Sequence, residues 1–205
     1  VAREVDTDPG APLLMGVDPA RFGDDEAVIA FRQGRNADVL PWRKYKRCST
    51  AELASSCAEY IEKYKPDGVF VEGDGVGGGV IDILREYGYR VIEVTAGGGA
   101  ENKEAYTNHR TELWGRIRDW LPGASLPKDS GLADDLAAPR YDYSLKGQLK
   151  LEPKDRMKKR GYASPNNADA LAMTFSRSVA RRDIATSRIG RKRRQATGMD
   201  YDLFA

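Results

Sequence analysis

The segment VFVEGDGVGGGVIDIL, residues 69–84, contains two patterns that imply different proteins. Gly73, Gly75 and Gly78 follow a β-branched run and precede a helical one, as in the glycine fingerprint of dinucleotide-binding folds. In the second interpretation Glu72 is the functional residue, a carboxylate at the end of a buried strand, and the glycines leave space beside it. Features elsewhere in the sequence distinguish these two interpretations.

The length and charge of the chain predict one folded domain with a tail. The 205 residues suffice for one large domain with its own core. The net charge of +2 is unevenly distributed, because residues 181–205 contain seven Arg or Lys against three Asp. We therefore expect a folded domain over residues 1–180 and a basic tail without regular structure over residues 181–205. The tail ends in MDYDLFA (199–205), an acidic and apolar sequence typical of a short docking peptide.

Membrane insertion, disulfides and zinc are not indicated. No apolar run approaches the ~18 residues of a membrane span, and no signal segment opens the chain. Cys48 and Cys57 lie nine residues apart with no histidine near them. This spacing fits neither a disulfide framework nor a zinc site, so we expect two reduced thiols.

Hydrophobic patterning predicts an α/β domain. Three apolar runs joined by turn-forming residues predict an antiparallel three-stranded meander, and helices then alternate with further strands, which favours parallel pairing. A Lys-Gly turn between alternating segments predicts an accessory β-hairpin. The predicted strands are 13–18, 26–33, 37–46, 68–72 and 89–94, the hairpin is 138–152, and the helices are 50–65, 76–88, 103–121 and 165–182.

Three acids occupy the ends of core elements. Asp18 closes the first strand, Glu72 closes the fourth, and Asp169 lies in the first turns of the last helix. A buried acid is costly unless it is compensated, and we find no matching buried arginine next to any of the three in the sequence. A divalent cation would compensate all three, and carboxylates without clustered Cys or His suit Mg²⁺ or Mn²⁺.

Two such ions, ~3.5–4 Å apart, activate a water molecule and stabilise the leaving oxygen of a phosphodiester. This chemistry needs no histidine, and the chain has only His109. Histidine-dependent nucleases and Ser-His-Asp hydrolases are therefore disfavoured. Acids at the ends of separate core elements, in a domain that begins with a meander and then alternates helix and strand, form the plan of a ribonuclease-H-like nuclease. We expect that fold, with a central mixed sheet flanked by helices.

The sequence resembles the C-terminal nuclease domain of the large terminase subunit of tailed bacteriophages. The most specific matches are GVDPA near the start and SPNNADALAMTF near the end, within a resemblance that extends from Leu13 to Phe175. The resemblance implies that Asp18, Glu72 and Asp169 are the catalytic, metal-binding acids. Many family members have Asp in place of Glu72, which changes the reach of the carboxylate more than its chemistry. Further candidate ligands are Asp24, Asp25 and Asp74.

The resemblance also implies a function and partners. It implies an endonuclease that cuts concatemeric double-stranded viral DNA during genome packaging in the cytoplasm of the host cell, with two Mg²⁺ or Mn²⁺ ions. The implied partners are the portal protein, the small terminase subunit and the N-terminal ATPase domain of the same parent protein. No G-x-x-x-x-G-K-[ST] motif occurs in this sequence, so we do not expect it to bind ATP.

DNA contacts are expected from the hairpin and the basic segment that follows it, because positive charge beside a carboxylate cluster suits a phosphodiester substrate. We find no side-chain pattern for reading bases, so cleavage with little sequence specificity is expected. The candidate DNA-binding residues are Lys146, Lys150, Lys154, Arg156, Lys158, Lys159 and Arg160.

Three other interpretations remain. A junction resolvase or RNA-strand nuclease would have the same fold and metal site. A DNA-clamping or portal-docking module without activity would not need the three acids. A dinucleotide-binding domain would use the glycines and Glu93, but it would leave Asp18 and Asp169 unexplained, and its glycine loop would normally follow the first strand.

Overall fold

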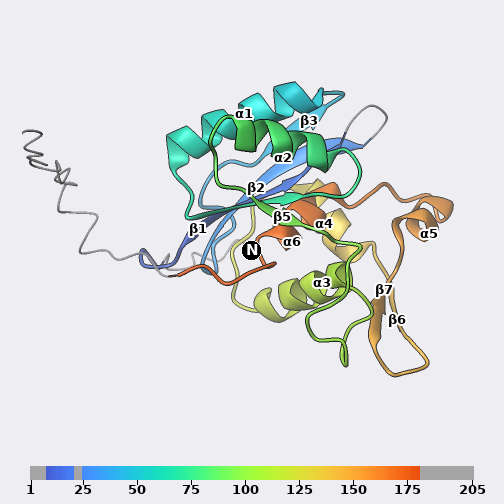
Figure 1. Ribbon diagram of the computed structural model, residues 1–205. Coiled ribbons are helices and arrows are strands. Elements are labelled where there is room, and N and C mark those ends of the chain that lie inside the picture. Colours follow the sequence, from blue (N-terminus) through green and yellow to red (C-terminus); the bar gives the residue numbers. More distant parts are fainter. Residues whose placement is uncertain (1–7, 21–24, 181–205) are drawn as a thin grey trace, which may run out of the picture.

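The computed structural model describes residues 8–20 and 25–180, which form a layered α/β arrangement around a five-stranded sheet (Figure 1). The strand order is β3-β2-β1-β4-β5. The first three strands pair antiparallel, and β1, β4 and β5 pair parallel, so the expected mixed sheet with an opening meander is confirmed. The bounds are β1 Leu13–Asp18, β2 Glu26–Gln33, β3 Arg43–Lys46, β4 Gly68–Glu72 and β5 Ile92–Val94.

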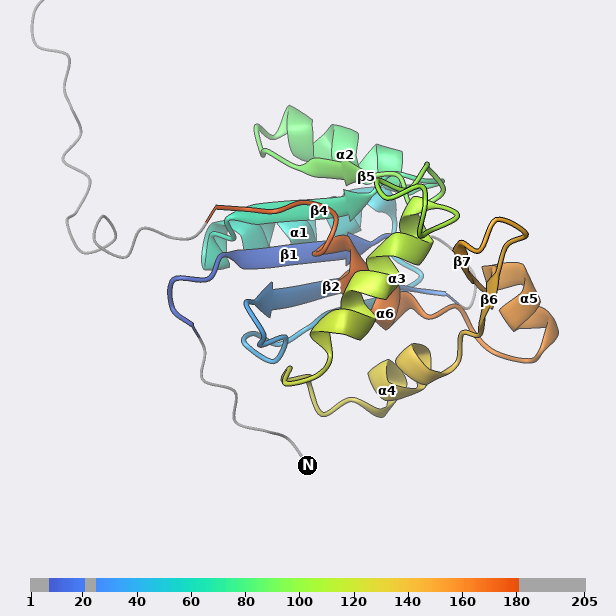
Figure 2. The ribbon, with the colours of Figure 1, turned by 90° about the horizontal axis from the view of Figure 1, so that it is seen from below.

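Helices cover both faces of the sheet. Helices α1 and α2 pack on one face, and α3, α4 and α6 lie on the other (Figures 1 and 2). The predicted hairpin is present as β6 and β7, which project beside α3 with the short α5 next to them (Figure 2). The helices are α1 Thr50–Tyr64, α2 Gly77–Glu86, α3 His109–Trp120, α4 Ser130–Ala137, α5 Lys154–Lys159 and α6 Asn166–Met173, and the hairpin strands are β6 Tyr141–Tyr143 and β7 Leu149–Leu151.

The alternation of side chains along β1 assigns each residue to one layer. Leu13, Met15 and Val17 belong to the core shared with α1 and α2, whereas Leu14 belongs to the core shared with α3 and α6. Because successive side chains of a strand point to opposite faces, Asp18 lies on the α6 side of the sheet.

Helix α6 packs against β1 at very short range. A Cβ atom on Gly16 would lie 2.1 Å from the carbonyl oxygen of Ala170, a distance that no side chain could tolerate. The helix therefore crosses the sheet where β1 has no side chain on that face. Ala170 then packs with Val28 and Ala30 of the neighbouring strand β2.

Several predicted boundaries were wrong. The third strand was expected from residue 37 but begins at Arg43, and α3 was expected from Lys103 but begins at His109, where the Asn108 side chain accepts a hydrogen bond from the Thr111 amide. The last helix was expected to reach residue 182 but ends at Met173.

The early end of α6 has a physical cause. The carbonyl oxygens of Thr174 and Phe175 accept hydrogen bonds from Arg32 and Arg116, at 2.7 Å in both cases, and these side-chain bonds replace the helical pattern. Helices α4 and α5 were not predicted, because α5 has only six residues and α4 only eight. So few residues carry no clear helical period.

The glycine turn after β4 is explained by close packing. A Cβ atom on Gly77 would lie 1.7 Å from the carbonyl oxygen of Glu72, so α2 can begin against the end of β4 only without a side chain there. Gly75 has φ of +65°, a left-handed conformation that favours glycine. Gly78, in contrast, has only one neighbour within ordinary contact distance, at 3.9 Å.

Within residues 8–20 and 25–180, no helix is both long enough and apolar enough to cross a membrane. Cys48 and Cys57 are both buried free thiols, and burial raises the pKa of Cys57 well above its usual range. The predicted division at residue 180 is not tested, because residues 181–205 lie outside the described residues.

Substitutions of Gly77 and Gly78, the first two residues of α2, should therefore have different effects. We expect Gly77→Ala to lower the free energy of unfolding by roughly 2–3 kcal/mol, because its methyl group overlaps the Glu72 carbonyl. Gly78→Ala should instead leave stability unchanged or raise it by up to about 1 kcal/mol, since alanine favours the helix. Urea unfolding of both variants measures the difference, and equal stabilities would contradict this explanation of the turn.

Candidate active site

The register of the sheet places two of the three predicted acids side by side. Gly16 pairs with Phe70 and Val17 with Val71 in the parallel ladder of β1 and β4. Continuing this register by one residue places Asp18 next to Glu72, at the carboxyl ends of the two strands and on the same face. The crossing of α6 over Gly16 brings the third acid, Asp169, to this edge of the sheet. The negative charge of Asp169 contributes to the raised pKa of Asp18.

Asp18 is almost fully buried, with 3% of its surface exposed. Burial raises its pKa well above the ordinary value, and the neighbouring Glu72 and Asp169 act in the same direction, while the ammonium group of Lys154 partly opposes them. A buried carboxyl group whose pKa is raised by two neighbouring acids is typical of a site that binds cations.

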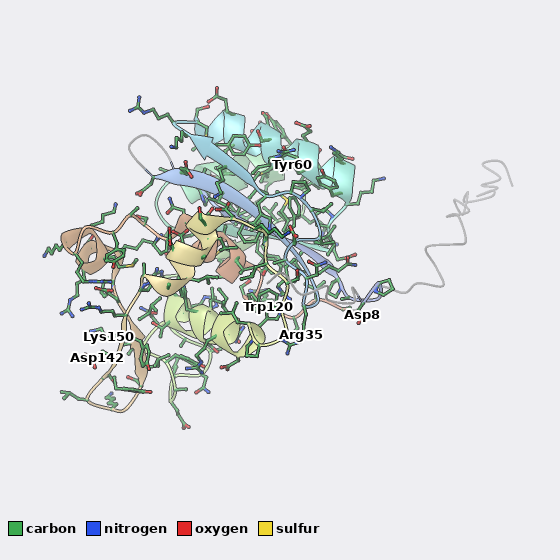
Figure 3. All side chains as sticks on the ribbon, turned by 180° about the vertical axis from the view of Figure 1, so that it is seen from behind. Asp8, Arg35, Tyr60, Trp120, Asp142 and Lys150 are labelled. Carbon is green, nitrogen blue, oxygen red and sulfur yellow. The ribbon has the colours of Figure 1, made fainter. Side chains whose placement is uncertain are left out.

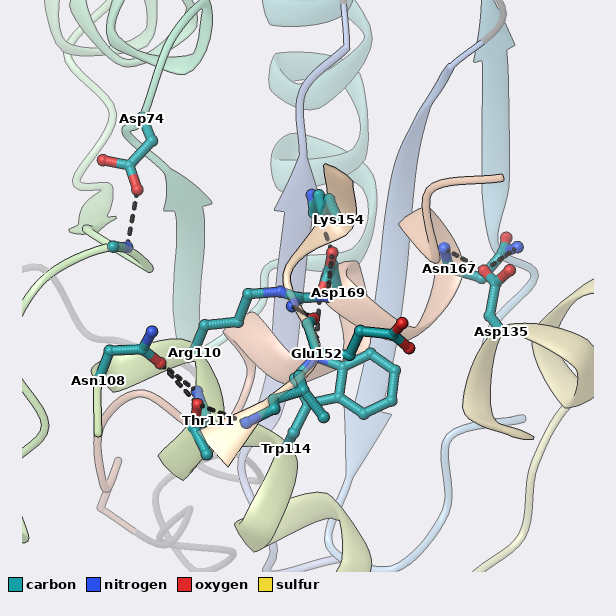
Figure 4. Close-up of polar contacts among 12 residues, drawn as sticks. Asp74, Asn108, Arg110, Thr111, Trp114, Asp135, Glu152, Lys154, Asn167 and Asp169 are labelled. Carbon is teal, nitrogen blue, oxygen red and sulfur yellow. Dashed lines mark hydrogen bonds and ion pairs between the residues drawn. The ribbon is translucent and has the colours of Figure 1, made fainter. Parts of the chain in front are cut away.

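Asp169 is equally buried but has polar partners from two other elements (Figure 4). Arg110 donates to both of its carboxylate oxygens, from Nε at 3.1 Å and from Nη2 at 3.4 Å. The indole Nε1 of Trp114 donates at 2.8 Å, and Lys154 Nζ lies 2.9 Å from Oδ2. Burial alone would raise the pKa of Asp169, but Arg110 and Lys154 outweigh it and lower the pKa.

These contacts correct one expectation from the sequence. We found no arginine placed to compensate a buried acid, but Arg110 does so for Asp169 from a different helix, α3. Trp114, one turn later on α3, was expected only as a core residue. Sequence proximity could not identify either residue as a partner of Asp169, because Arg110 and Trp114 lie 59 and 55 residues from it in the sequence.

Lys154 lies among all three acids. Its burial alone would lower its pKa, but Asp169, Asp18 and Glu72 together raise it well above the usual value. In the part of the chain that the structure describes, no group of three or more Asp, Glu, His or Cys side chains is arranged to hold a metal ion. The donor chemistry of the three carboxylates fits Mg²⁺ or Mn²⁺, but the lysine supplies the positive charge in this arrangement.

A hollow of about 280 Å³ opens beside the acids. Its lining includes both carboxylates and cations: Glu72, Asp74, Arg110, Lys150 and Lys154. Asp74, one of the candidate ligands, is exposed there, and its Oδ2 accepts a hydrogen bond of 2.9 Å from the Gly97 amide (Figure 4).

Helix α6 is fixed at its start by a residue that we did not identify in the sequence. Asp135 of α4 accepts hydrogen bonds of 2.8 Å from both the backbone amide and the side-chain amide of Asn167 (Figure 4). It thus caps the first turn of α6, where Pro165 offers no hydrogen-bonding side chain. Because Asp169 lies in this turn, Asp135 helps to set its position.

The base of the hairpin is bound to the same site. Arg110 donates to the carbonyl oxygen of Glu152 at 3.2 Å, and the Leu151 amide donates to Thr111 Oγ1 at 3.2 Å. Lys154 follows two residues after Glu152. The hairpin, the lysine and the arginine that hold Asp169 are therefore parts of one connected structure.

The remaining predicted ligands lie at the edge of the site. Asp24 is outside the described residues. Asp25 precedes β2, and its carboxylate is 3.2 Å from the ammonium group of Lys158. The structure thus pairs this candidate ligand with a candidate DNA-binding residue.

The seven candidate DNA-binding cations separate into two groups. Lys154 is bound to Asp169, and Arg160 is bound to the Glu152 carboxylate at 2.6 and 2.8 Å, so both are half-buried in ion pairs. The other five are exposed and lie on the hairpin and on α5, with Lys150 visible on the hairpin in Figure 3. These five are Lys146, Lys150, Arg156, Lys158 and Lys159.

The residues of the dinucleotide fingerprint have structural partners. The glycine turn follows the fourth strand of the chain, not the first. Glu93 lies 3.5 Å from Arg85 and packs against Gly73, where a Cβ atom would approach it to 2.6 Å. Close packing therefore explains Gly73 and Glu93, and the left-handed backbone explains Gly75, without a bound nucleotide.

No protein-family model and no curated protein sequence matches the chain. Solved structures do match it. The nuclease domain of the large terminase subunit gp2 of bacterial virus Sf6, as a lysine-to-alanine variant with manganese and beta-thujaplicinol, has a TM-score of 0.72 and 18% identity, over 84% of this chain and 91% of that one.

Two further structures agree. The large terminase nuclease from thermophilic phage G20c with bound magnesium has a TM-score of 0.61 and 15% identity, over 84% of this chain and 85% of that one. The large terminase nuclease domain of Thermus phage P74-26 has a TM-score of 0.58 and 14% identity, over 83% and 81%. The resemblance seen in the sequence is thereby confirmed at the level of the fold: the chain has the ribonuclease-H-like fold of the nuclease domains of bacteriophage large terminase subunits.

Proposed function

We propose that this domain is a metal-dependent endonuclease that cleaves concatemeric double-stranded viral DNA during genome packaging. The observation that carries the proposal is the meeting of Asp18, Glu72 and Asp169 at one edge of the sheet, in a fold that matches terminase nucleases. Hydrolysis of a phosphodiester by carboxylates and divalent cations requires no histidine. Several of the matching structures were solved with manganese, calcium, magnesium or cobalt, which supports a divalent metal here.

Asp18, Glu72 and Asp169 would hold two Mg²⁺ or Mn²⁺ ions, with Asp25, Asp24 and Asp74 as auxiliary ligands. When bound, the ions supply an activated water and charge stabilisation for the leaving oxygen. The contribution of the protein is to orient its carboxylates before DNA arrives. Arg110 and Trp114 fix the plane of the Asp169 carboxylate through three hydrogen bonds, so both oxygens have defined directions.

Lys154 has a place in this mechanism. Its ammonium group lies where it neutralises all three acids, so it competes with a cation for the same carboxylates. We infer that, with the three carboxylates neutralised by bound metal, Lys154 would be free to pair with the scissile phosphate in place of Asp169. This assigns Lys154 to the active site and not to general DNA binding.

DNA would approach along the hairpin and α5. The five exposed cations there supply phosphate contacts, and Lys150 lines the hollow beside Glu72, so a backbone held at the hairpin continues to the acids. Contacts to phosphate position a duplex without reading its sequence, which supports weak sequence specificity. The basic tail, residues 181–205, is a candidate for further phosphate contacts.

The wider setting follows from the same resemblance. We propose that the domain works in the host cell cytoplasm as part of a larger protein with an N-terminal ATPase domain, and that the portal protein and the small terminase subunit are partners. No motif for ATP phosphates occurs in these 205 residues, so the energy for DNA movement would come from that other domain.

The first test is cleavage of supercoiled plasmid. We expect nicking and linearisation in Mn²⁺ or Mg²⁺, no cleavage in EDTA, and a loss of at least about a hundredfold in Asp18→Ala and Asp169→Ala, because each removes a ligand of the ions. Cleavage that persists in both variants, or in EDTA, would contradict the assignment of a metal-dependent nuclease site to these acids. Four-way junctions and RNA–DNA hybrids in the same assay test the resolvase and RNA-strand alternatives, which predict faster cleavage of those substrates.

The second test concerns Lys154. We expect Lys154→Ala to bind Mn²⁺ at least about tenfold more tightly than the unaltered chain, because the variant no longer has an ammonium group competing for Asp169. Isothermal titration calorimetry without DNA measures this affinity. Lys159→Ala, a neighbouring exposed lysine on α5, is the matched control and should leave the affinity unchanged. Equal affinities of all three proteins would exclude competition by Lys154.

The third test concerns the hairpin. In EDTA, where no cleavage occurs, Lys150→Ala should weaken DNA binding and reduce the slope of log K against log salt by about 0.9, the value for one lost phosphate contact. Fluorescence anisotropy with a labelled duplex measures the slope. Lys63→Ala, an exposed lysine on α1 at the opposite face, should leave it unchanged. A slope insensitive to Lys150→Ala would remove this residue from the DNA-binding surface.

A further inference from the structure

A second and larger hollow, of about 750 Å³, lies at the end of the molecule opposite the acids. Its lining includes Pro12 and Leu14 at the start of β1, whereas the acids lie where β1 ends. Figure 3 shows Asp8, which precedes β1, on the other side of the molecule from Lys150 on the hairpin. Nothing in the proposed nuclease mechanism uses this hollow.

One wall of the hollow carries a guanidinium group without a counter-charge. Arg32 donates to Thr174 Oγ1 at 2.9 Å, to the Thr174 carbonyl at 2.7 Å and to the Gly34 carbonyl at 3.1 Å, all of which are neutral acceptors. No carboxylate within residues 8–20 and 25–180 forms an ion pair with it, and burial lowers the pKa of Arg32 to about 10. A buried charge of this kind is costly unless an anion accompanies it.

Other polar groups of the lining are consistent with an anion. Arg177 is exposed at the edge of the hollow and adds a second cation. Ser176 is only 3% exposed, and its hydroxyl has no hydrogen-bond partner among the described residues. Arg116 and one carboxylate, Glu101, also line the hollow, and Arg116 forms ion pairs with Glu101 and Glu112. The lining thus has an excess of positive charge and an unused hydroxyl group.

Apolar side chains form another part of the lining. Leu14, Phe175 and Val179 contribute to it, and the Phe175 ring lies 4.0 Å from the guanidinium carbon of Arg32. A small inorganic anion would satisfy the arginines but would leave this apolar surface in water. The chemistry therefore fits a segment that alternates carboxylates with apolar side chains.

The chain itself contains such a segment. Residues 199–205, MDYDLFA, combine two aspartates with tyrosine, leucine and phenylalanine. Val179 lines the hollow, so the eighteen residues 181–198 are the only link between the folded part and this segment. Eighteen residues of a random-coil chain would span about 25 Å on average, which is enough for a return to the same hollow.

We propose that residues 199–205 of this chain dock in the arginine-lined hollow, with Asp200 and Asp202 facing Arg32 and Arg177 and with Leu203 and Phe204 on the apolar wall. Because the segment is tethered, its effective concentration at the hollow is about millimolar, so a modest intrinsic affinity suffices. Docking would hold the carboxyl-terminal segment at the end of the molecule opposite the nuclease site. It does not depend on the proposed nuclease activity.

The test is a titration with a fluorescein-labelled peptide of residues 199–205, followed by anisotropy. The receptor is the full chain, either unaltered or with Asp200→Lys and Asp202→Lys, which disable its own segment. We expect the double variant to bind the peptide and the unaltered chain to bind it at least about tenfold more weakly, because its own segment occupies the hollow. Equal binding by both proteins, or no binding by either, would overturn the proposal.

Two further measurements localise the peptide. In the double-variant background, Arg177→Glu should weaken peptide binding at least about tenfold, whereas Lys128→Glu, an exposed lysine on the loop before α4, should have no effect. Arg177 is exposed, so its substitution should not disturb folding. A scrambled peptide of the same composition that binds equally well, or a peptide that millimolar inorganic phosphate displaces completely, would reduce the hollow to an unspecific anion site and refute docking.

Discussion

The crossing of α6 over β1 determines the candidate active site. Helix α6 can approach β1 this closely only because Gly16 has no side chain. The contact between Ala170 and the Gly16 backbone sets the distance between the helix and the sheet. Asp169 immediately precedes Ala170, so the same contact brings its carboxylate to the edge where Asp18 and Glu72 end their strands. Strand register positions two acids, and one short helix contact positions the third.

The sequence was sufficient to predict the mixed sheet and the positions of these three acids at the ends of core elements, while their catalytic role stays a prediction. Apolar runs marked the strands, and Asp18 and Glu72 followed from where the runs stop, since the ends of neighbouring parallel strands meet at one edge. Arg110 and Trp114 could not be predicted, because their role depends on the angle at which α3 packs beside α6. On α3 the pattern indicated only a buried stripe. The end of α6 was missed for a similar reason, because Arg32 and Arg116 from distant elements bind its last carbonyls.

The glycine segment illustrates how one pattern can have two causes. A fingerprint glycine makes room for pyrophosphate, whereas Gly77 makes room for the backbone of Glu72 itself. The critical glycine is not one of the three in the fingerprint. Sequence alone does not distinguish these causes, since both place small residues between a strand and a helix.

The acids are balanced by protein charges, and this balance connects the site to the DNA-binding surface. Lys154 and Arg110 both form ion pairs with Asp169, and the charge of Lys154 also acts on Asp18 and Glu72. Both cations are attached to the base of the hairpin, since Arg110 holds the Glu152 carbonyl and Lys154 follows within two residues. A shift of the hairpin on DNA binding would therefore move Arg110 and Lys154, the cations that neutralise the acids. Substrate binding and the affinity of the acids for cations are then linked through one short segment of backbone.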